Sequence, residues 1–339
     1  MLRHRASSAL LTAQNMMHMC MCMFLAAVLA GSPTDASCTA PPIARELSAD
    51  ERQTYHDEGY VIVRSMFSAD EVAVLLQTIE SDPAIQTNVM PMVDASGRSS
   101  KVTLWNRAGN NTYGHFARGR RWVSAATALI GERPYHFHTK VMLKEPLAGG
   151  QWEWHQDFGY WYQVGCLQPD LMLSSILAVD NHSRENGCMQ LLARSHRLGR
   201  LAHGVTGEQA GADAAAVEAA RARLPLVHAE MGAGDVLFTH SNLLHASAPN
   251  LSPRWRRSLI VAYNAVSNPP RAGTVCPLPE EAPLEPAFPD EAVLAFGPRG
   301  HAERGVGAAG TELDGDGADP APGFLDHERN ARQFGGGAR

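Results

Sequence analysis

The residues of this chain with the clearest chemical potential are two histidines and one aspartate. His155 and Asp157 stand one residue apart in an aromatic segment, and His245 follows further along the chain. Imidazole and carboxylate ligands suit non-haem iron(II), and three ligands on one side leave the opposite positions open for substrate and O₂. In an extended strand, residues i and i+2 point to the same side, so His155 and Asp157 can reach one metal ion while Gln156 faces away. The set indicates an iron site, although a His-x-Asp tripeptide taken alone is more often a surface or hydrogen-bonded pair.

An arginine follows His245 at the start of an apolar, β-branched run. Arg256, Ser258 and Ile260 would share one face of this expected strand. A buried guanidinium is costly alone and pairs bidentately with a carboxylate. Two interpretations stay open from the residues themselves: a structural ion pair with an internal Asp or Glu, and a partner for a carboxylate that a ligand brings.

The elements that must position these residues are mainly short strands. We expect strands over 135–144, 151–157, 171–180, 188–192, 236–240 and 257–264, separated by turns with Gly, Pro and Asn. This pattern predicts a mainly-β domain, a double-stranded β-helix or jelly roll of the cupin kind. Flanking helices are expected after the capping boxes at Ser48 and Ser68, and over 120–130. An alanine-rich insertion within 207–223 should also be helical, and the polar segment 86–111 is expected to be a loop that covers the site.

Taken together, the motifs resemble those of the phytanoyl-CoA dioxygenase family, to which ectoine hydroxylase belongs. The resemblance covers roughly residues 50 to 270 and rests on segments 59–63, 155–161, 185–190, 195–196 and 245–247 and on Arg256. It implies that His155, Asp157 and His245 ligate iron(II). It also implies that Arg256 binds the distal carboxylate of 2-oxoglutarate with Ser247 beside it. Thr139 and Lys140 match positions that contribute to the cosubstrate pocket in members of the family.

The resemblance also implies an activity. This is oxidative decarboxylation of 2-oxoglutarate to succinate and CO₂, coupled to hydroxylation of a C–H bond in a small-molecule or lipid-derived substrate. Related halogenating enzymes replace the carboxylate ligand by a small residue, so Asp157 favours hydroxylation. Tyr160 and Trp161 directly follow the motif and are candidate substrate contacts, with simple aromatic packing as the alternative.

Two functions of other classes remain as alternatives. One is a non-catalytic cupin-like binding module, which the complete set of candidate ligands argues against. The other is a zinc-dependent hydrolase that uses the same three ligands. Arg256 distinguishes the second alternative, because hydrolysis has no need of a dicarboxylate anchor.

Composition limits the partners. The net charge is −6, and no Lys/Arg cluster is interleaved with aromatics, so nucleic acid is not an expected partner, whereas a small molecule and O₂ are. With 339 residues and 45% hydrophobic content the chain can bury a sizeable core. We expect one catalytic domain over 45–270. Cys38, Cys166, Cys188 and Cys276 have no metal-finger spacing and are expected to be buried thiols rather than disulfides.

The two ends of the chain differ from this domain. Residues 1–34 contain Arg3 and Arg5, no acidic residue, and an apolar stretch over 16–30 that ends in small residues. They predict a targeting peptide, with a secretory signal as the first interpretation and an organellar presequence as the second. The apolar stretch is too short to favour a membrane anchor, so no stable span is expected in the mature chain. Residues 271–339 are rich in Gly and Pro, and we expect disorder at least beyond residue 299.

Overall fold

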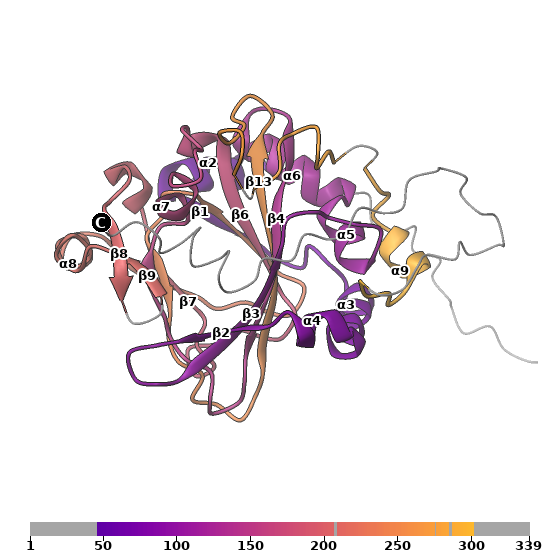
Figure 1. The fold of residues 1–339 in the computed structure, drawn as a ribbon, viewed down its shortest axis with the longest axis horizontal. Coiled ribbons are helices and arrows are strands. Elements are labelled where there is room, and N and C mark those ends of the chain that lie inside the picture. Colours follow the sequence, from indigo (N-terminus) through magenta and orange to yellow (C-terminus); the bar gives the residue numbers. More distant parts are fainter. Residues whose placement is uncertain (1–45, 207–208, 275, 285–286, 302–339) are drawn as a thin grey trace, which may run out of the picture. The chain divides into compact units, whose positions relative to one another are not determined.

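Two antiparallel sheets form the framework of the computed structural model, which describes residues 46–206, 209–274, 276–284 and 287–301 (Figure 1). The larger sheet consists, in spatial order, of β1 (Tyr60–Val63), β11 (Val236–His240), β6 (Met172–Ala178), β13 (Arg256–Ala265), β4 (Pro134–Lys144), β3 (Ser99–Trp105) and β2 (Met90–Val93). The smaller sheet consists of β10 (Leu226–Ala229), β7 (Met189–Leu192), β12 (His245–Ser247) and β5 (Trp152–His155). A separate hairpin pairs β8 (His203–Thr206) with β9 (Gln209–Ala212).

The two sheets pack against each other through an apolar layer. Ile176 and Leu237 of the larger sheet share one buried cluster with Met189 and Leu191 of the smaller sheet. The alternation of strand residues sends every second side chain of the larger sheet into this layer. The prediction of a mainly-β domain is therefore confirmed.

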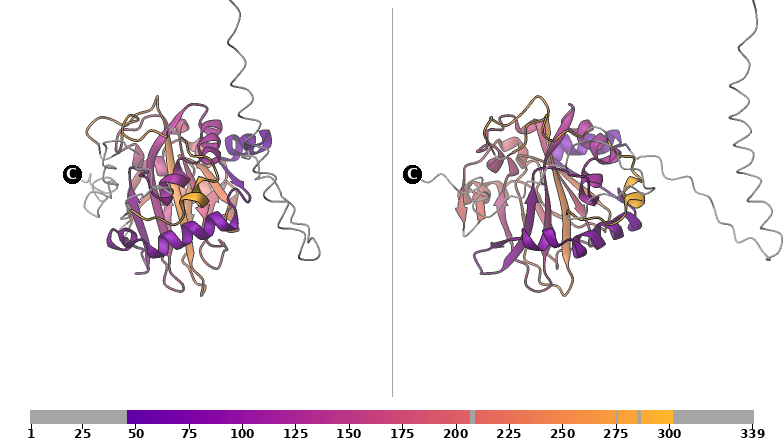
Figure 2. Two further views of the ribbon diagram at one scale, coloured as in Figure 1. Left: turned by 90° about the vertical axis from the view of Figure 1, so that its right-hand side faces the viewer. Right: turned by 45° about the vertical axis from the view of Figure 1, so that its right-hand side comes forward.

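Helices cover the opposite face of the larger sheet (Figures 1 and 2). Val141 and Val261 of the sheet pack in one core cluster with Phe116 and Trp122 of the helices. The helices of this layer are α2 (Ala49–Glu58), α3 (Ala69–Ser81), α4 (Pro83–Thr87), α5 (Thr112–Ala117), α6 (Arg120–Ile130) and α9 (Ala292–Phe296). Both predicted capping boxes are present, and α6 ends at Gly131 in the left-handed conformation that favours glycine.

Two expected segments differ from the prediction. The segment 86–111 is no covering loop, because it contains the strands β2 and β3, and β3 pairs with β4 in the larger sheet. Val102 and Leu104 alternate with polar residues and are buried on one face of β3, which lies between β2 and β4; the polarity of the surrounding segment hides this period-two pattern. The insertion after β8 contains the expected helix, α8 (Ala214–Arg221), but the strand β9 precedes it.

The compact unit extends past the predicted boundary at residue 270. The ring of His115 stacks between Phe288 and Phe296, at centroid distances of 4.0 and 3.9 Å. The Nδ1 atom of His301 lies 2.7 Å from a carboxylate oxygen of Asp82. These contacts order residues of a segment whose Gly and Pro content predicts disorder. The predicted targeting peptide and the tail beyond 301 lie outside the described residues.

Two further predictions concern cysteines and membrane spans. Cys166 and Cys188 are free thiols, and both are buried, as is Cys276. Cys38 lies outside the described residues. Within the described ranges, none of the helices has the length and apolar character needed to span a bilayer.

Candidate active site

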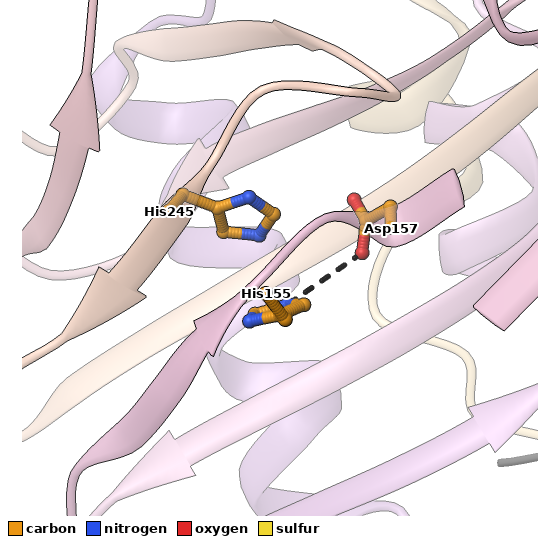
Figure 3. A group of neighbouring side chains, drawn as sticks. All are labelled: His155, Asp157 and His245. Carbon is orange, nitrogen blue, oxygen red and sulfur yellow. Dashed lines mark ion pairs between the residues drawn. The ribbon is translucent and has the colours of Figure 1, made fainter. Parts of the chain in front are cut away.

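The three candidate ligands converge between the two sheets (Figure 3). His155 is the last residue of β5 and pairs in register with His245, the first residue of β12, so their ring centroids lie 4.1 Å apart. The Nε2 atom of His155 lies 3.8 Å from Oδ1 of Asp157. One ligand atom from each residue falls within 4.8 Å of the others, and all three side chains are buried. The residue set predicted from the sequence is thus brought together by the fold.

Asp157 reaches this position from a helical turn, not from a strand as expected. It is the first residue of α7 (Asp157–Trp161), and Gln156 is the N-cap. The side-chain amide of Gln156 donates to the carbonyls of Gly199 and Asn242 at 2.8 and 2.7 Å, and its oxygen accepts from the N–H of Leu201 at 2.7 Å. Gln156 therefore faces away from the ligands, as predicted, and these three bonds fix the turn that points Asp157 toward the histidines.

Hydrogen bonds leave one atom of each ligand available for a metal ion. The Nδ1 atom of His155 lies 2.7 Å from the carbonyl of Glu153, and that of His245 lies 2.9 Å from the carbonyl of Leu243. Because a carbonyl can only accept, each Nδ1 carries the hydrogen and each Nε2 presents its lone pair. The hydroxyl of Ser174 donates to Oδ2 of Asp157 at 2.6 Å and leaves Oδ1 facing the histidines. The donor set and its supporting bonds fit a divalent metal such as iron(II).

The electrostatics of the site favour the protonation states that bind a metal ion. Burial, together with the nearby His245, holds the pKa of His155 well below its ordinary value. Burial acts to raise the pKa of Asp157, but His245, Lys140 and the other neighbouring groups outweigh it and keep that pKa below its ordinary value. At neutral pH, His155 is therefore neutral and Asp157 is ionised, which is the state that binds a metal ion.

Arg256 has no structural counter-ion. Its side chain is buried, with 3% exposure, and among the described residues it forms no ion pair, while its Nε atom has no hydrogen-bond partner. The nearby carboxylate of Asp180 bonds instead to Nε and Nη2 of Arg257, both at 2.8 Å. Burial lowers the pKa of Arg256 to about 10, so the guanidinium stays charged at neutral pH. Of the two interpretations left open, the structure favours a partner for a ligand's carboxylate.

A buried lysine beside Arg256 was missed from the sequence. Lys144 pairs in register with Arg256 on the neighbouring strand, and its side chain is fully buried. Its Nζ donates to the carbonyl of Ala248 at 2.5 Å. Ser247 is buried on β12 opposite Met189, which belongs to the layer between the sheets. The alternation of residues 140, 142 and 144 along a buried strand was the available signal for Lys144.

The two other cosubstrate candidates lie on opposite faces of β4. Thr139 pairs with Val261 on the helix-covered face, and its hydroxyl lies 2.7 Å from Nε2 of His136. Lys140 pairs with Ile260 on the face toward the ligands, where its charge acts on Asp157. The fold therefore brings Lys140 to the site and turns Thr139 away from it.

The aromatic residues after the ligand motif have different surroundings. The ring of Tyr160 lies 5.5 Å from that of His155, and its hydroxyl donates to the carbonyl of Ala210 in β9. Trp161 has 1% exposure and packs edge-on against Phe137 and His138, at 5.4 and 5.8 Å. Tyr160 thus borders the metal ligands, while Trp161 is a buried residue that packs against the ring of His138.

The β8–β9 hairpin closes one side of the ligand motif. Nε2 of His203 accepts from the N–H of Gln156 at 3.0 Å. A Cβ atom on Gly159 would lie 2.2 Å from the ring of His203, so only glycine allows this approach. The side-chain amide of Gln209 bonds both Glu153 and Gln151 of the β5 segment. These contacts hold the hairpin against the segment that carries His155.

Comparison with known proteins agrees with this geometry. The sequence profile of the family described as phytanoyl-CoA dioxygenase (PhyH) matches residues 55–258. This chain belongs to that family. The family's match spans all three candidate ligands and Arg256.

Individual relatives support the enzyme class. The ectoine dioxygenase of Bordetella bronchiseptica is 28% identical over 263 residues, which cover 72% of this chain and 85% of the relative. An L-proline trans-4-hydroxylase from Streptomyces griseoviridis is 26% identical over 246 residues, covering 65% and 88%. The prediction that the chain is a 2-oxoglutarate-dependent oxygenase of this family is confirmed.

Solved structures share the fold. EctD from S. alaskensis, in complex with 2-oxoglutarate and 5-hydroxyectoine, has a TM-score of 0.54 and 23% identity, covering 68% of this chain and 83% of that protein. SnoK, a non-haem α-ketoglutarate-dependent carbocyclase of nogalamycin biosynthesis, has a TM-score of 0.56 and 21% identity, covering 72% and 90%.

Proposed function

We propose that this protein uses iron(II), 2-oxoglutarate and O₂ to hydroxylate a C–H bond of a small-molecule or lipid-derived substrate, with succinate and CO₂ as coproducts. The observation that carries the proposal is Arg256, a buried cation that has no counter-ion among the described residues and lies on the same side of the larger sheet as the metal ligands. The two facing sheets that hold the site are consistent with a double-stranded β-helix, or jelly roll.

The metal would be held by Nε2 of His155, Nε2 of His245 and Oδ1 of Asp157. Iron(II) at this position supplies the redox chemistry that couples O₂ to the decarboxylation of 2-oxoglutarate. Ser174 keeps the second oxygen of Asp157 occupied at 2.6 Å and so fixes which oxygen faces the metal. The carbonyls of Glu153 and Leu243 fix the orientation of the two imidazole rings.

The distal carboxylate of 2-oxoglutarate would bind Arg256, with the hydroxyl of Ser247 beside it and the amine of Lys144 opposite Arg256 in register. A guanidinium offers two parallel N–H donors that match the two oxygens of a carboxylate. The buried position excludes water, which strengthens this pairing. Thr139 has no part in this arrangement, because its side chain lies on the other face of β4.

The substrate would enter beside Tyr160, the aromatic residue that borders the ligands. An intact carboxylate ligand at Asp157 favours hydroxylation over halogenation. Solved structures of similar fold include a carbocyclase and an epimerase, so the fate of oxygen distinguishes the outcomes. Under ¹⁸O₂, one oxygen atom enters succinate in every case; hydroxylation places the other in the product formed from the substrate, whereas cyclisation and epimerisation leave that product unlabelled.

The first test measures succinate released from 2-oxoglutarate by the iron-loaded protein during a screen of candidate metabolites. We expect turnover in the wild type and its loss in His155→Ala. His228→Ala, on the half-buried strand β10, is the matched control and should keep wild-type turnover. Equal turnover in wild type and His155→Ala would show that the metal assignment is wrong. Hydrolytic activity with zinc but none with iron and 2-oxoglutarate would support the zinc-hydrolase alternative instead.

A further inference from the structure

We propose that the substrate of this site carries a carboxylate, which Lys140 and His138 bind on the ligand-facing side of β4. The proposal rests on the proposed function, because it assigns a substrate class to the same site. It moves Lys140 from the cosubstrate, where the sequence interpretation placed it, to the substrate.

The strand register places both residues beside the metal ligands. His138 pairs with Ala262 of β13, which in turn pairs with Ser174 of β6, the residue that bonds Asp157. Lys140 lies two residues further along the same face, toward Arg256. Burial lowers the pKa of Lys140, and the charge of Asp157 partly offsets this effect. His138 therefore lies level with the metal ligand, and Lys140 lies between the metal and the cosubstrate anchor.

The charges of the complete site leave Lys140 without a counter-ion. When iron(II) is bound, Asp157 and one carboxylate of 2-oxoglutarate offset the two charges of the metal. The other carboxylate of 2-oxoglutarate offsets Arg256. Lys140, whose side chain is half-buried, would then lose Asp157 as its partner, and a cation that is partly removed from water is stabilised by a counter-ion. A carboxylate on the substrate would restore neutrality.

His138 provides an independent observation that points to a ligand. Its side chain has 2% exposure, and neither ring nitrogen has a hydrogen-bond partner among the described residues. Buried polar groups are nearly always paired, so an imidazole with two unpaired nitrogens is expected to meet a ligand. Trp161 packs edge-on against the ring at 5.8 Å and holds its orientation. An imidazole N–H and an ammonium group together match the two oxygens of a carboxylate.

The cosubstrate itself does not account for this pair. Both ends of 2-oxoglutarate already have partners, one at the metal and the other at Arg256 with Lys144 opposite in register. Lys140 and Lys144 are four residues apart on one strand, about 13 Å at the rise of a β-strand, so they serve different parts of the site. Lys140 and His138 are left for the molecule that is oxidised.

The test uses acetate and its neutral isostere acetamide as probes, because both are small enough to enter any pocket that admits a substrate. The protein is loaded with iron(II) and saturating 2-oxoglutarate under argon, and binding is followed by tryptophan fluorescence at constant ionic strength. We expect acetate to bind at least about tenfold more tightly than acetamide, equal to about 1.4 kcal/mol. Lys140→Met should abolish this preference, and Lys140→Arg should restore it.

The controls separate this proposal from the proposed function. Lys101→Met removes a half-buried lysine of β3 that pairs with Glu145 and should leave the preference unchanged. His138→Phe should weaken acetate binding while 2-oxoglutarate affinity stays as in the wild type. Equal binding of the two probes by the wild type, or an unchanged preference in Lys140→Met, would overturn the carboxylate site. A wild-type protein that does not bind 2-oxoglutarate would instead overturn the proposed function.

Discussion

Replacing Arg256 by methionine distinguishes a cosubstrate anchor from a structural ion pair. Methionine keeps an unbranched apolar side chain and removes only the guanidinium. If Arg256 completed a buried ion pair, its loss would lower the free energy of unfolding by about 3–5 kcal/mol. The structure shows a guanidinium with 3% exposure and no ion pair among the described residues. We therefore expect the metal-free protein to be at least as stable after the substitution, because an uncompensated buried charge is removed.

The same substitution should strongly weaken 2-oxoglutarate binding. Removing one partner of a buried charge pair costs about 2–5 kcal/mol of binding free energy. At about 1.4 kcal/mol per factor of ten, the dissociation constant should rise roughly 30-fold to several thousand-fold. Calorimetric titration of the iron-loaded protein under argon measures this constant. Iron affinity should not change, because the three ligands are held by bonds that do not involve Arg256.

Arg257→Met is the matched control on the neighbouring position of the same strand. Arg257 bonds Asp180 and Glu80, so its loss should lower the free energy of unfolding by roughly 1–3 kcal/mol. Its 2-oxoglutarate affinity should stay within about threefold of the wild type, because it faces away from the site. The anchor role is refuted if Arg256→Met binds 2-oxoglutarate like the wild type or loses as much stability as Arg257→Met.

Three further predictions test other parts of the structure. Ser174→Ala removes the hydrogen bond to Oδ2 of Asp157 and should weaken metal binding about 10- to 100-fold in an iron titration. Ser175→Ala removes a hydroxyl that bonds only a backbone carbonyl and should leave metal binding unchanged. Burial, with a smaller effect of the nearby Arg118, lowers the pKa of His136 to about 3. As the pH falls, His136 is therefore protonated in the unfolded chain before it is protonated in the folded protein. The free energy of unfolding should then fall as pH drops from 6.5 toward 3, by up to about 1.4 kcal/mol per pH unit. His136→Gln should show a shallower slope in urea unfolding between pH 7 and 4, and parallel curves would contradict the assignment. A chain ending after residue 301 should keep the wild-type melting temperature while one ending after 270 should melt lower, and equal melting would show that segment 271–301 is dispensable.

Local structure was largely determined by the sequence itself. The capping boxes at Ser48 and Ser68 and the glycine that ends α6 depend on residues within a few positions of each other. The strands that alternate or carry β-branched runs were predicted for the same reason, because side-chain direction repeats every two residues. Ligand chemistry also depends on residue type, so His155, Asp157 and His245 were identified before their geometry was known.

The sequence could not determine how the ligand motif bends. Strand alternation predicted that His155 and Asp157 share a face, yet Asp157 opens a helix. The turn depends on bonds from Gln156 to Gly199, Leu201 and Asn242, which lie more than forty residues away. No local pattern contains these partners.

The tertiary structure also decided which charges are available to a ligand. Arg256 and Arg257 are adjacent in the sequence, and only the direction of each side chain assigns Asp180 to Arg257 and leaves Arg256 without an ion pair in the part of the chain that the structure describes. Register across β4 and β13 likewise brings Lys144 and Lys140 to the site and turns Thr139 toward the helices. Residue types and local periodicity are properties of the sequence. The pairing of a buried charge is a property of the assembled sheets, because its partners come from different strands.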